Sequence, residues 1–243
     1  MEELLTIVTA TLPGRLQEHL PLLIGIDGPG GAGKSTFAAA LARRLQRERI
    51  SVAIVRMDDF FLPSTQRPAG RGTDKPLGGD FDWQRLRDQV LIPLAHHQPA
   101  AYQRYDWPTD SLAEWQTLAG CHIVIVEGVY ALRHELRDLY DLTLWIDCPR
   151  PVRLARGIVR DGEAARAQWE HDWMPAEDHY ITTERPHLTA NFYVTNADPT
   201  ARLPDWHIQS LPQGAHAGAP LLPDRPDFQG MTYDTETATL ATA

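Results

Sequence analysis

Cysteine and lysine are scarce in this sequence. The two cysteines, Cys121 and Cys148, lie in or beside apolar, strand-like runs and have no C-x-x-C spacing. This usage fits buried free thiols in a reducing compartment better than a disulfide framework. Only Lys34 and Lys75 among the 23 basic residues are lysines. Genome composition accounts for this bias, and it makes Lys34 easy to test chemically.

Long apolar runs and an excess of positive charge are missing as well. No run approaches the roughly 18 apolar residues of a membrane-spanning helix, and Met1-Glu2-Glu3 does not read as the start of a signal peptide. A formal net charge of −9 argues against a broad nucleic-acid surface, because neutralising many phosphates needs a basic face. We therefore expect a cytoplasmic protein with a small-molecule substrate, and with neither nucleic acid nor membrane as a partner.

Apolar runs alternate with helical patterns through most of the chain. Strands are expected at 22–26, 52–55, 123–126 and 142–147, with a short final strand at 192–194. Helices are expected at 35–48, 83–96, 150–160 and 166–180. Strands that are apolar throughout and separated by helices predict an α/β fold, in which helices cover both faces of a parallel sheet.

The remaining segments read as less regular. A short helix within residues 2–20 is expected to be interrupted by Pro13 and Gly14, and residues 98–118 are aromatic and irregular. We expect one folded domain in residues 1–211, followed by an extended or disordered tail in residues 212–243, which are rich in Pro, Gly, Thr and Ala. The alternative for the tail is that it wraps a partner subunit, which leaves a homo-oligomer open.

Residues 28–35 match the phosphate-loop pattern G-x-x-x-x-G-K-[ST] completely, and they lie between an expected strand and an expected helix. Glycines let the backbone turn so that successive N–H groups face phosphate oxygens, and the positive end of the following helix points at the same charge. The motif predicts a three-layer P-loop NTPase fold that binds the phosphates of a nucleotide, and we expect this nucleotide to be ATP. The expected contacts come from Gly28, Gly30, Gly31, Ala32, Gly33, Lys34, Ser35 and Thr36.

Two of these residues have specific roles in the pattern. Lys34 is expected to reach the β- and γ-phosphates and to act in catalysis, and the Ser35 hydroxyl is expected to bind Mg²⁺. The pattern by itself does not separate a kinase from a GTPase, a motor or an AAA-type ATPase.

Acidic residues follow two of the expected strands. Asp58 and Asp59 come at the end of the second strand, and Glu127 ends the strand at 123–126. Sites in open parallel sheets lie beyond the carboxyl ends of the strands. Phosphoryl transfer to an alcohol needs carboxylates for hydrated Mg²⁺ and for the proton of the attacking hydroxyl. We expect Asp58 to be the base and Glu127 to be a metal-site residue; the alternative is that Asp59 and Glu127 cap neighbouring helices or turns.

The order of these motifs resembles the uridine kinase and phosphoribulokinase-like family, whose relatives include nicotinamide riboside kinases and type I pantothenate kinases. The resemblance covers about residues 20–197 and is carried by the phosphate loop, Met57-Asp58-Asp59-Phe60-Phe61, Phe81-Asp82 and Val126-Glu127-Gly128. It implies a small helical lid at about 150–180 and a catalytic base at Asp58.

The resemblance also implies two contacts with the substrate. Asp82 follows a phenylalanine in a loop ahead of a helix. An aspartate at this position holds the ribose hydroxyls in nucleoside kinases of the family, so the resemblance implies a substrate contact. The alternative is that Asp82 caps the N-terminus of that helix. Residues 102–107 resemble the Y-D-[FY] element of the family, so Tyr105 is expected near the base of the substrate, with core packing as the alternative.

Two patterns of the family are altered here. Uridine kinases follow the Y-D element with T-H-S-R, which reads the pyrimidine, whereas residues 108–112 are Pro-Thr-Asp-Ser-Leu. The lid pattern R-x-x-R-D…E-R-G-R is reduced to Arg153, Arg156 and Arg160, without the E-R-G-R segment. These three arginines share a helix face. We expect Arg156 to contact ATP and Arg160 to neutralise charge in the transition state, with solvated surface arginines as the alternative.

The expected activity is an ATP- and Mg²⁺-dependent transfer of the γ-phosphoryl group to a hydroxyl of a small metabolite, first of all a nucleoside. The missing T-H-S-R pattern motivates an alternative acceptor such as pantothenate or glycerate. A nucleotide-binding switch or ATPase without an acceptor is the third hypothesis. Against it, residues 195–198 lack the lysine of the guanine-reading N-K-x-D motif.

Overall fold

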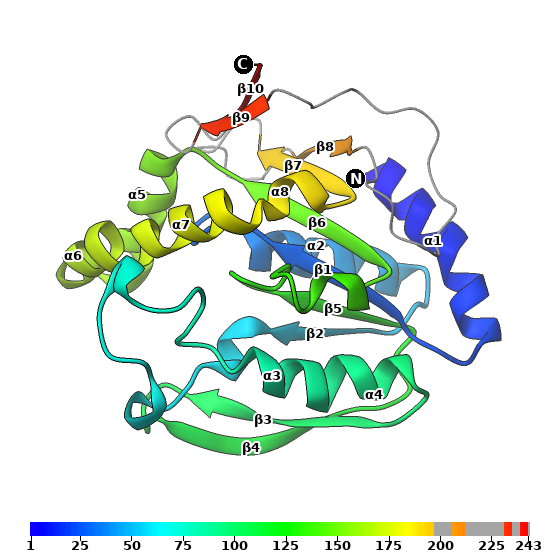
Figure 1. Cartoon of the computed structure of the whole chain (residues 1–243). Helices are drawn as coiled ribbons and strands as arrows, with labels where there is room; N and C mark the ends of the chain where they lie inside the picture. Colours follow the sequence, from blue (N-terminus) through cyan, green and yellow to red (C-terminus); the bar gives the residue numbers. More distant parts are fainter. Residues whose placement is uncertain (197–205, 212–230, 235–238, 243) are drawn as a thin grey trace.

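The centre of the molecule is a six-stranded sheet with the order β2-β5-β1-β6-β7-β8. It is seen in a computed structural model that describes residues 1–196, 206–211, 231–234 and 239–242 (Figure 1). The first five strands of this order are parallel, and β8 is antiparallel to β7. Across the sheet the strands are β2 (Val52–Arg56), β5 (Ile123–Glu127), β1 (Leu22–Asp27), β6 (Leu142–Asp147), β7 (Phe192–Asn196) and β8 (Trp206–Ser210).

Helices cover both faces of this sheet because its central strands are apolar on both sides. In β1, Ile24 and Ile26 pack into one core and Leu23 into the other; in β5, Ile125 and Val126 are divided in the same way. The first core is closed by α1 (Glu2–Gln17) and α2 (Lys34–Arg47). The second is closed by α3 (Trp83–Leu86), a π-helical turn, α4 (Ile92–Ala95) and part of α7 (Met174–Glu184). The predicted α/β fold with a parallel sheet is confirmed.

The lid lies at the carboxyl edge of the sheet (Figure 1). It consists of α5 (Arg150–Asp161), α6 (Arg166–Gln168), the π-helical turn η7 (Trp169–Trp173) and α7, and the short α8 (Pro186–Thr189) follows. The buried Trp169 ring packs directly on Gly157 of α5, where a Cβ atom would collide with the indole. Its Nε1 donates to Asp161 at 3.0 Å. A glycine inside α5 therefore lets the two lid helices approach closely.

The structure corrects three expectations for individual elements. Helix α1 continues through Pro13 instead of being interrupted, because Leu4, Val8 and Leu12 remain buried against the sheet. Residues 98–118 form an antiparallel hairpin of β3 (Ala100–Asp106) and β4 (Ser111–Leu118). Strand β4 is exposed along most of its length, so no apolar alternation marks it in the sequence. Finally, β7 is followed by β8 and is not the last strand.

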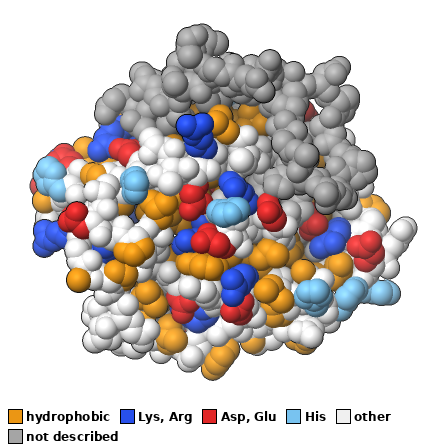
Figure 2. All heavy atoms as spheres, viewed as in Figure 1, with side chains coloured by type: hydrophobic (Ala, Val, Ile, Leu, Met, Phe, Trp, Pro, Cys, Tyr) orange, Lys and Arg blue, Asp and Glu red, His pale blue; other side chains and the backbone are white. Residues whose placement is uncertain are grey.

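Part of the expected tail lies outside the described residues. Within residues 212–243 the structure describes only β9 (Met231–Asp234) and β10 (Thr239–Thr242), which pair antiparallel. The domain boundary at residue 211 and the cytoplasmic location stay predictions. In the described part of the chain, no helix has the length and apolar character needed to span a bilayer. Acidic and basic side chains alternate over the face in Figure 2, with no continuous basic surface.

Candidate active site

A cavity of about 510 Å³ lies at the carboxyl ends of β1, β2 and β5. Its walls come from segments that are distant in sequence: the phosphate loop, the turn η1 (Met57–Phe60), the loop at 70–81, Trp107, residues 127–130 and the lid. Of the residues predicted for the site, the cavity is lined by Gly30, Gly31, Gly33, Lys34, Ser35, Thr36, Asp58, Glu127, Arg156 and Arg160. The remaining predicted residues, Gly28, Ala32, Asp82 and Tyr105, lie outside this lining.

The phosphate loop adopts the backbone that its glycines permit. Gly31 and Gly33 have φ angles of 78° and 100°, a region that other residues rarely adopt. A Cβ on Gly31 would also lie 2.5 Å from the carbonyl oxygen of Arg153. Gly28 and Ala32 are buried in the turn. They shape the loop without facing the cavity.

Lys34 begins α2 and is buried beneath the loop. Its Nζ donates to the carbonyl oxygens of Gly28 and Pro29, at 2.7 and 3.0 Å. The ammonium is thus held inside the loop by main-chain acceptors. The hydroxyl-bearing Ser35 and Thr36 are exposed on the first turn of the same helix, whose N-terminus faces the cavity. This arrangement suits an anion, because free N–H groups, the helix dipole and one ammonium converge on the same space.

Glu127, at the end of β5, is buried beside the phosphate loop. Burial raises the pKa of its carboxyl group, while Lys34, the Ser35 hydroxyl and Arg56 oppose that rise. The Nε of Arg56 is 3.9 Å from Glu127 Oε1. A carboxylate and a hydroxyl side by side provide the oxygen ligands that Mg²⁺ prefers, with phosphates and water completing the set. The residues present therefore fit a magnesium site.

The two neighbouring aspartates after β2 point to different places. Asp58 is exposed in η1 and lines the cavity, as predicted for the base. Asp59 is half-buried and accepts a hydrogen bond from the Tyr102 hydroxyl at 3.2 Å. Burial raises the pKa of Asp59, and the Tyr102 hydrogen bond acts in the opposite direction. The short helical turn thus separates a carboxylate that faces the cavity from one that packs against the hairpin.

Asp82 and Tyr105 have partners within the protein. Asp82 caps α3 by accepting the Arg85 N–H at 3.0 Å, which is the alternative role that the sequence left open. Tyr105 is buried, donates to Asp110 at 2.6 Å and accepts from Arg67 at 2.7 Å. Their assignment as substrate contacts stays a prediction that the geometry does not favour.

The three arginines of the lid have separate environments. Arg153 is 1% exposed and pairs with Glu177 at 3.2 Å, so it does not face the cavity. Arg156 lines the cavity and donates to the Gly31 carbonyl oxygen at 3.3 Å. Arg160 also lines the cavity, and Asp161 holds its guanidinium through two hydrogen bonds of 2.7 and 2.9 Å. Arg156 and Arg160 thus line the cavity, and their phosphate contacts stay a prediction, whereas Arg153 ties the lid to the loop.

Glu177 is a residue of the site that sequence reasoning missed. It is buried on α7, and a Cβ on Gly30 would lie 2.7 Å from its Oε1. Burial raises the pKa of Glu177, while Arg153, Lys34 and the Gly30 N–H oppose the rise. It joins the lid to the phosphate loop. No local pattern signals this role, because the contact joins residues that are far apart in the sequence.

Asp27, at the end of β1, was also missed. Its carboxylate accepts from the N–H groups of Gly28 at 2.6 Å and Leu132 at 2.8 Å, and from the Tyr180 hydroxyl at 2.8 Å. Burial raises the pKa of Asp27 to about 6, against the effect of these hydrogen bonds and of Lys34. This carboxylate fixes the entry to the phosphate loop relative to the lid helix α7. An acidic residue directly before the first glycine was the available signal.

The far half of the cavity is aromatic. Phe61, Phe81, Trp107 and Tyr130 line it, together with residues of the loop at 70–81 and of the lid. Trp107 is two residues beyond Tyr105 in the motif that the sequence singled out, and it lines the cavity whereas Tyr105 does not. The phosphate loop, a carboxylate and an aromatic compartment therefore share one enclosed space.

This geometry is that of a P-loop kinase, and comparison with known proteins decides which kind. A model of the phosphoribulokinase / uridine kinase family matches residues 23–197. The chain belongs to this family. It is 26% identical over 172 residues to a uridine kinase of Ureaplasma parvum, covering 66% of this chain and 82% of the relative. It is 27% identical over 192 residues to a uridine kinase of Leuconostoc citreum, covering 75% and 84%.

Solved structures of this family and fold agree with the architecture. A structure described as a possible uridine kinase from Bacillus stearothermophilus aligns with a TM-score of 0.58 and 26% identity, over 71% of this chain and 88% of that chain. A D-glycerate 3-kinase from Cryptococcus neoformans shares the fold, with a TM-score of 0.50 and 14% identity over 84% and 99%. The resemblance and the P-loop fold inferred from the sequence are confirmed. As a member of this family, the chain is a phosphotransferase of the small-molecule kinase type.

Proposed function

We propose that this member of the family is an ATP- and Mg²⁺-dependent kinase that phosphorylates a hydroxyl of a nucleoside or of a closely similar ribosyl compound. The observation that carries the proposal is that Asp58, the phosphate loop and an aromatic compartment line one cavity. A planar base fits an aromatic compartment through stacking. The names of the related uridine kinases point the same way.

In the proposed reaction, Lys34, the loop N–H groups and Arg156 hold the phosphates of ATP. Asp58 accepts the proton of the substrate hydroxyl as its oxygen bonds to the γ-phosphorus. The bond between that phosphorus and the β–γ bridging oxygen breaks, and ADP leaves with the electron pair. Arg160 would leave Asp161 to neutralise the developing charge. Bound Mg²⁺, held through Ser35 and Glu127, would polarise the phosphates.

Enclosure of the cavity supports transfer to an alcohol over transfer to water. The short turn η3 (Gly72–Asp74) in the loop at 70–81 packs against α7 and η7. A Cβ on Gly72 would lie 3.1 Å from the carbonyl oxygen of His171. The loop and the lid thus meet over the aromatic compartment. Closure of this kind excludes water and commits ATP to the acceptor.

The replacement of the pyrimidine-reading pattern favours a second candidate acceptor, a non-nucleoside alcohol. Asp110 occupies this stretch and bonds to Ser64, Arg67 and Tyr105 within the protein. It stabilises the hairpin. Residues 108–112 contain no histidine or arginine that could read a pyrimidine. A panel of nucleosides, pantothenate and glycerate, with ADP release as the readout, separates the two candidates.

Asp58→Asn tests the role of the proposed base. The variant is expected to bind ATP normally and to lose about 10²–10⁴ in kcat, because proton transfer from the hydroxyl is removed. Asp59→Asn is the matched control, since it removes the same charge one residue later from a side chain that faces Tyr102. Near-normal turnover by Asp58→Asn would reject the assignment. ATP hydrolysis that no acceptor changes would instead support a switch or ATPase.

A further inference from the structure

The aromatic half of the cavity has a continuous wall on the side of η1 and β5. The Phe61 ring lies 4.6 Å from the Trp107 ring and 4.9 Å from the Phe81 ring, measured between centroids, and Phe81 is 5.6 Å from Tyr130. Phe61 and Tyr130 are buried, whereas Trp107 is 53% exposed at the rim. The wall therefore offers aromatic carbon atoms and few polar groups to an acceptor.

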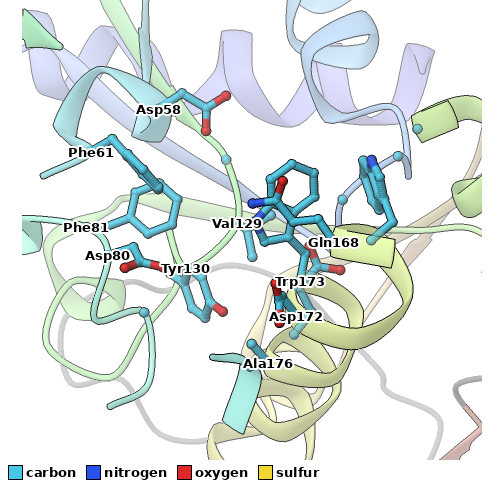
Figure 3. Close-up of a pocket in the computed structure, with 18 of the residues that line it drawn as sticks. Asp58, Phe61, Asp80, Phe81, Val129, Tyr130, Gln168, Asp172, Trp173 and Ala176 are labelled. Carbon is cyan, nitrogen blue, oxygen red and sulfur yellow. The ribbon is translucent and has the colours of Figure 1, made fainter. Parts of the chain in front are cut away.

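The opposite wall belongs to the lid and carries polar side chains, among them Gln168 and Asp172, beside tryptophan rings. Figure 3 shows Gln168, Asp172, Trp173 and Ala176 on the lid helices, across the opening from Phe61, Phe81 and Tyr130. The π-helical turn η7 supplies Asp172 and Trp173, and its first residue, Trp169, is anchored against Gly157. A π-helical turn changes the direction of successive side chains, and such turns are frequent at functional sites. Here the anchored turn presents a carboxylate to the acceptor space.

Asp172 is not neutralised by the part of the protein that the structure describes. It is half-buried, and no hydrogen bond or ion pair joins its side chain to another described residue. The other lid-facing carboxylate at this end, Asp80, pairs with Lys75 at 2.7 Å. The remaining cationic group of the lining loop, Arg71, is exposed and lines the cavity, and it precedes Gly72, whose Cβ would lie 3.7 Å from the Asp172 Cα. His179 of α7 is exposed as well and lies near Thr183.

Among the described residues, the two cavity-lining carboxylates without an ion pair, Asp58 and Asp172, outnumber Arg71, the one such cation of the loop at 70–81, so the local charge balance is negative where the acceptor would lie. Asp58 and Asp172 both line the cavity, and within the described chain neither side chain forms an ion pair. The cations Lys34, Arg156 and Arg160 belong to the phosphate end. A cavity with an aromatic wall on one side and an unpaired carboxylate on the other suits a planar ring that is neutral or positively charged.

We propose that Asp172 is a specificity-determining residue that selects acceptors with a neutral or cationic planar ring and rejects acceptors that carry a carboxylate or a phosphate. The inference rests on the proposed function and narrows it to one class of alcohol. Two like charges about 6 Å apart at an effective dielectric of about 20 repel enough to weaken binding roughly 100-fold. Because Asp172 is half-buried, solvent screening reduces the expected discrimination to about 10- to 100-fold.

The test uses three ribonucleosides that differ in one substituent: 5-aminomethyluridine is cationic, 5-hydroxymethyluridine is neutral and 5-carboxyuridine is anionic. For the wild-type enzyme we expect kcat/KM to fall in that order, by at least about 10-fold from cation to anion. In Asp172→Asn the ratio of cation to anion is expected to fall about 10-fold. A structural role alone would lower kcat/KM for all three acceptors alike and leave the ratio unchanged.

Glu170→Gln is the matched control, because Glu170 lies in the same turn, pairs with Arg166 and does not line the cavity. It changes the net charge equally, and its cation-to-anion ratio is expected to equal that of the wild type. The order of the three acceptors in the wild-type enzyme tests the inference even where a variant folds poorly. Raising the ionic strength is expected to shrink the ratio for the wild type and to change it less for Asp172→Asn.

The outcomes separate the two proposals. Equal use of all three nucleosides by the wild type, or an unchanged ratio in Asp172→Asn, overturns the role of Asp172 and leaves the nucleoside kinase proposal intact. Preference for pantothenate or glycerate over every nucleoside overturns the charge rule and moves the activity to the non-nucleoside candidate. Phosphorylation of none of these acceptors overturns the proposed function, and the inference with it.

Discussion

Asp27 makes the stability of this protein depend on pH in a way that one substitution reveals. The carboxyl group is fully buried, and its pKa is raised from 3.8 to about 6, chiefly by burial. Between pH of about 4 and about 6 the unfolded chain releases this proton while the folded protein keeps it. The contribution of Asp27 to the free energy of unfolding is therefore complete below pH 4 and is lost as the pH rises through about 6.

The size of the effect follows from the two pKa values. At about 1.4 kcal/mol for each pH unit, the difference between 3.8 and about 6 amounts to about 3 kcal/mol. Asp27→Asn removes the titration. It also costs about 1–3 kcal/mol at every pH, because the amide replaces one of the two oxygens that face the donors of Gly28, Leu132 and Tyr180 with an NH2 group that can only donate. The variant is thus expected to be most destabilised, relative to the wild type, at the acidic end.

Urea unfolding of both proteins at a series of pH values from about 4.5 to about 7.5 measures this difference. Asp74→Asn, at an exposed position on the loop before α3, controls for the change in net charge. We expect the stability gap between wild type and Asp27→Asn to narrow as the pH rises and to level off above about 6.5. A gap that stays constant over this range would refute the buried, proton-binding state of Asp27.

Two further substitutions test the walls of the site. Gly157→Ala places a methyl group against the Trp169 indole, so we expect a loss of about 1–3 kcal/mol in the free energy of unfolding. Gly14→Ala is the control, because no atom lies within 4 Å of its Cβ. Equal stability of the two variants would contradict the packing. Asp110→Ala removes the hydrogen bonds that hold Tyr105 and Arg67. The KM of the acceptor is therefore expected to rise about 3- to 10-fold, while the KM of ATP stays constant. A change in the KM of ATP alone would argue against a role for the hairpin on the acceptor side.

The contact between the lid and the phosphate loop has a consequence for nucleotide binding. Arg153 and Glu177 form a buried ion pair that touches the loop at Gly30 and Gly31. The Arg156 side chain also bonds to the Gly31 carbonyl oxygen. A loop that is held by the lid in this way is already shaped before ATP arrives, which lowers the ordering cost of binding.

The phosphate loop and the strand-end carboxylates could be predicted from the sequence because their placement is local. Glycines that adopt positive φ angles, a lysine at the start of a helix and a carboxylate at the end of a parallel strand take their positions from a few neighbouring residues. Asp58, Glu127 and Lys34 accordingly line the cavity as predicted. The apolar strand runs likewise predict the parallel sheet, since a strand that is buried on both sides needs a layer on each.

The acceptor side was decided only by the tertiary structure. Strand β3 ends at Asp106, so Trp107 lies in the turn beyond it and lines the cavity. Tyr105 lies within the strand, where Asp110 and Arg67 hold its hydroxyl. Asp172 faces the same space because a π-helical turn is anchored on a glycine of another helix. Strand register, helix packing and side-chain direction depend on residues far apart in the chain. Periodicity along the sequence therefore cannot specify them.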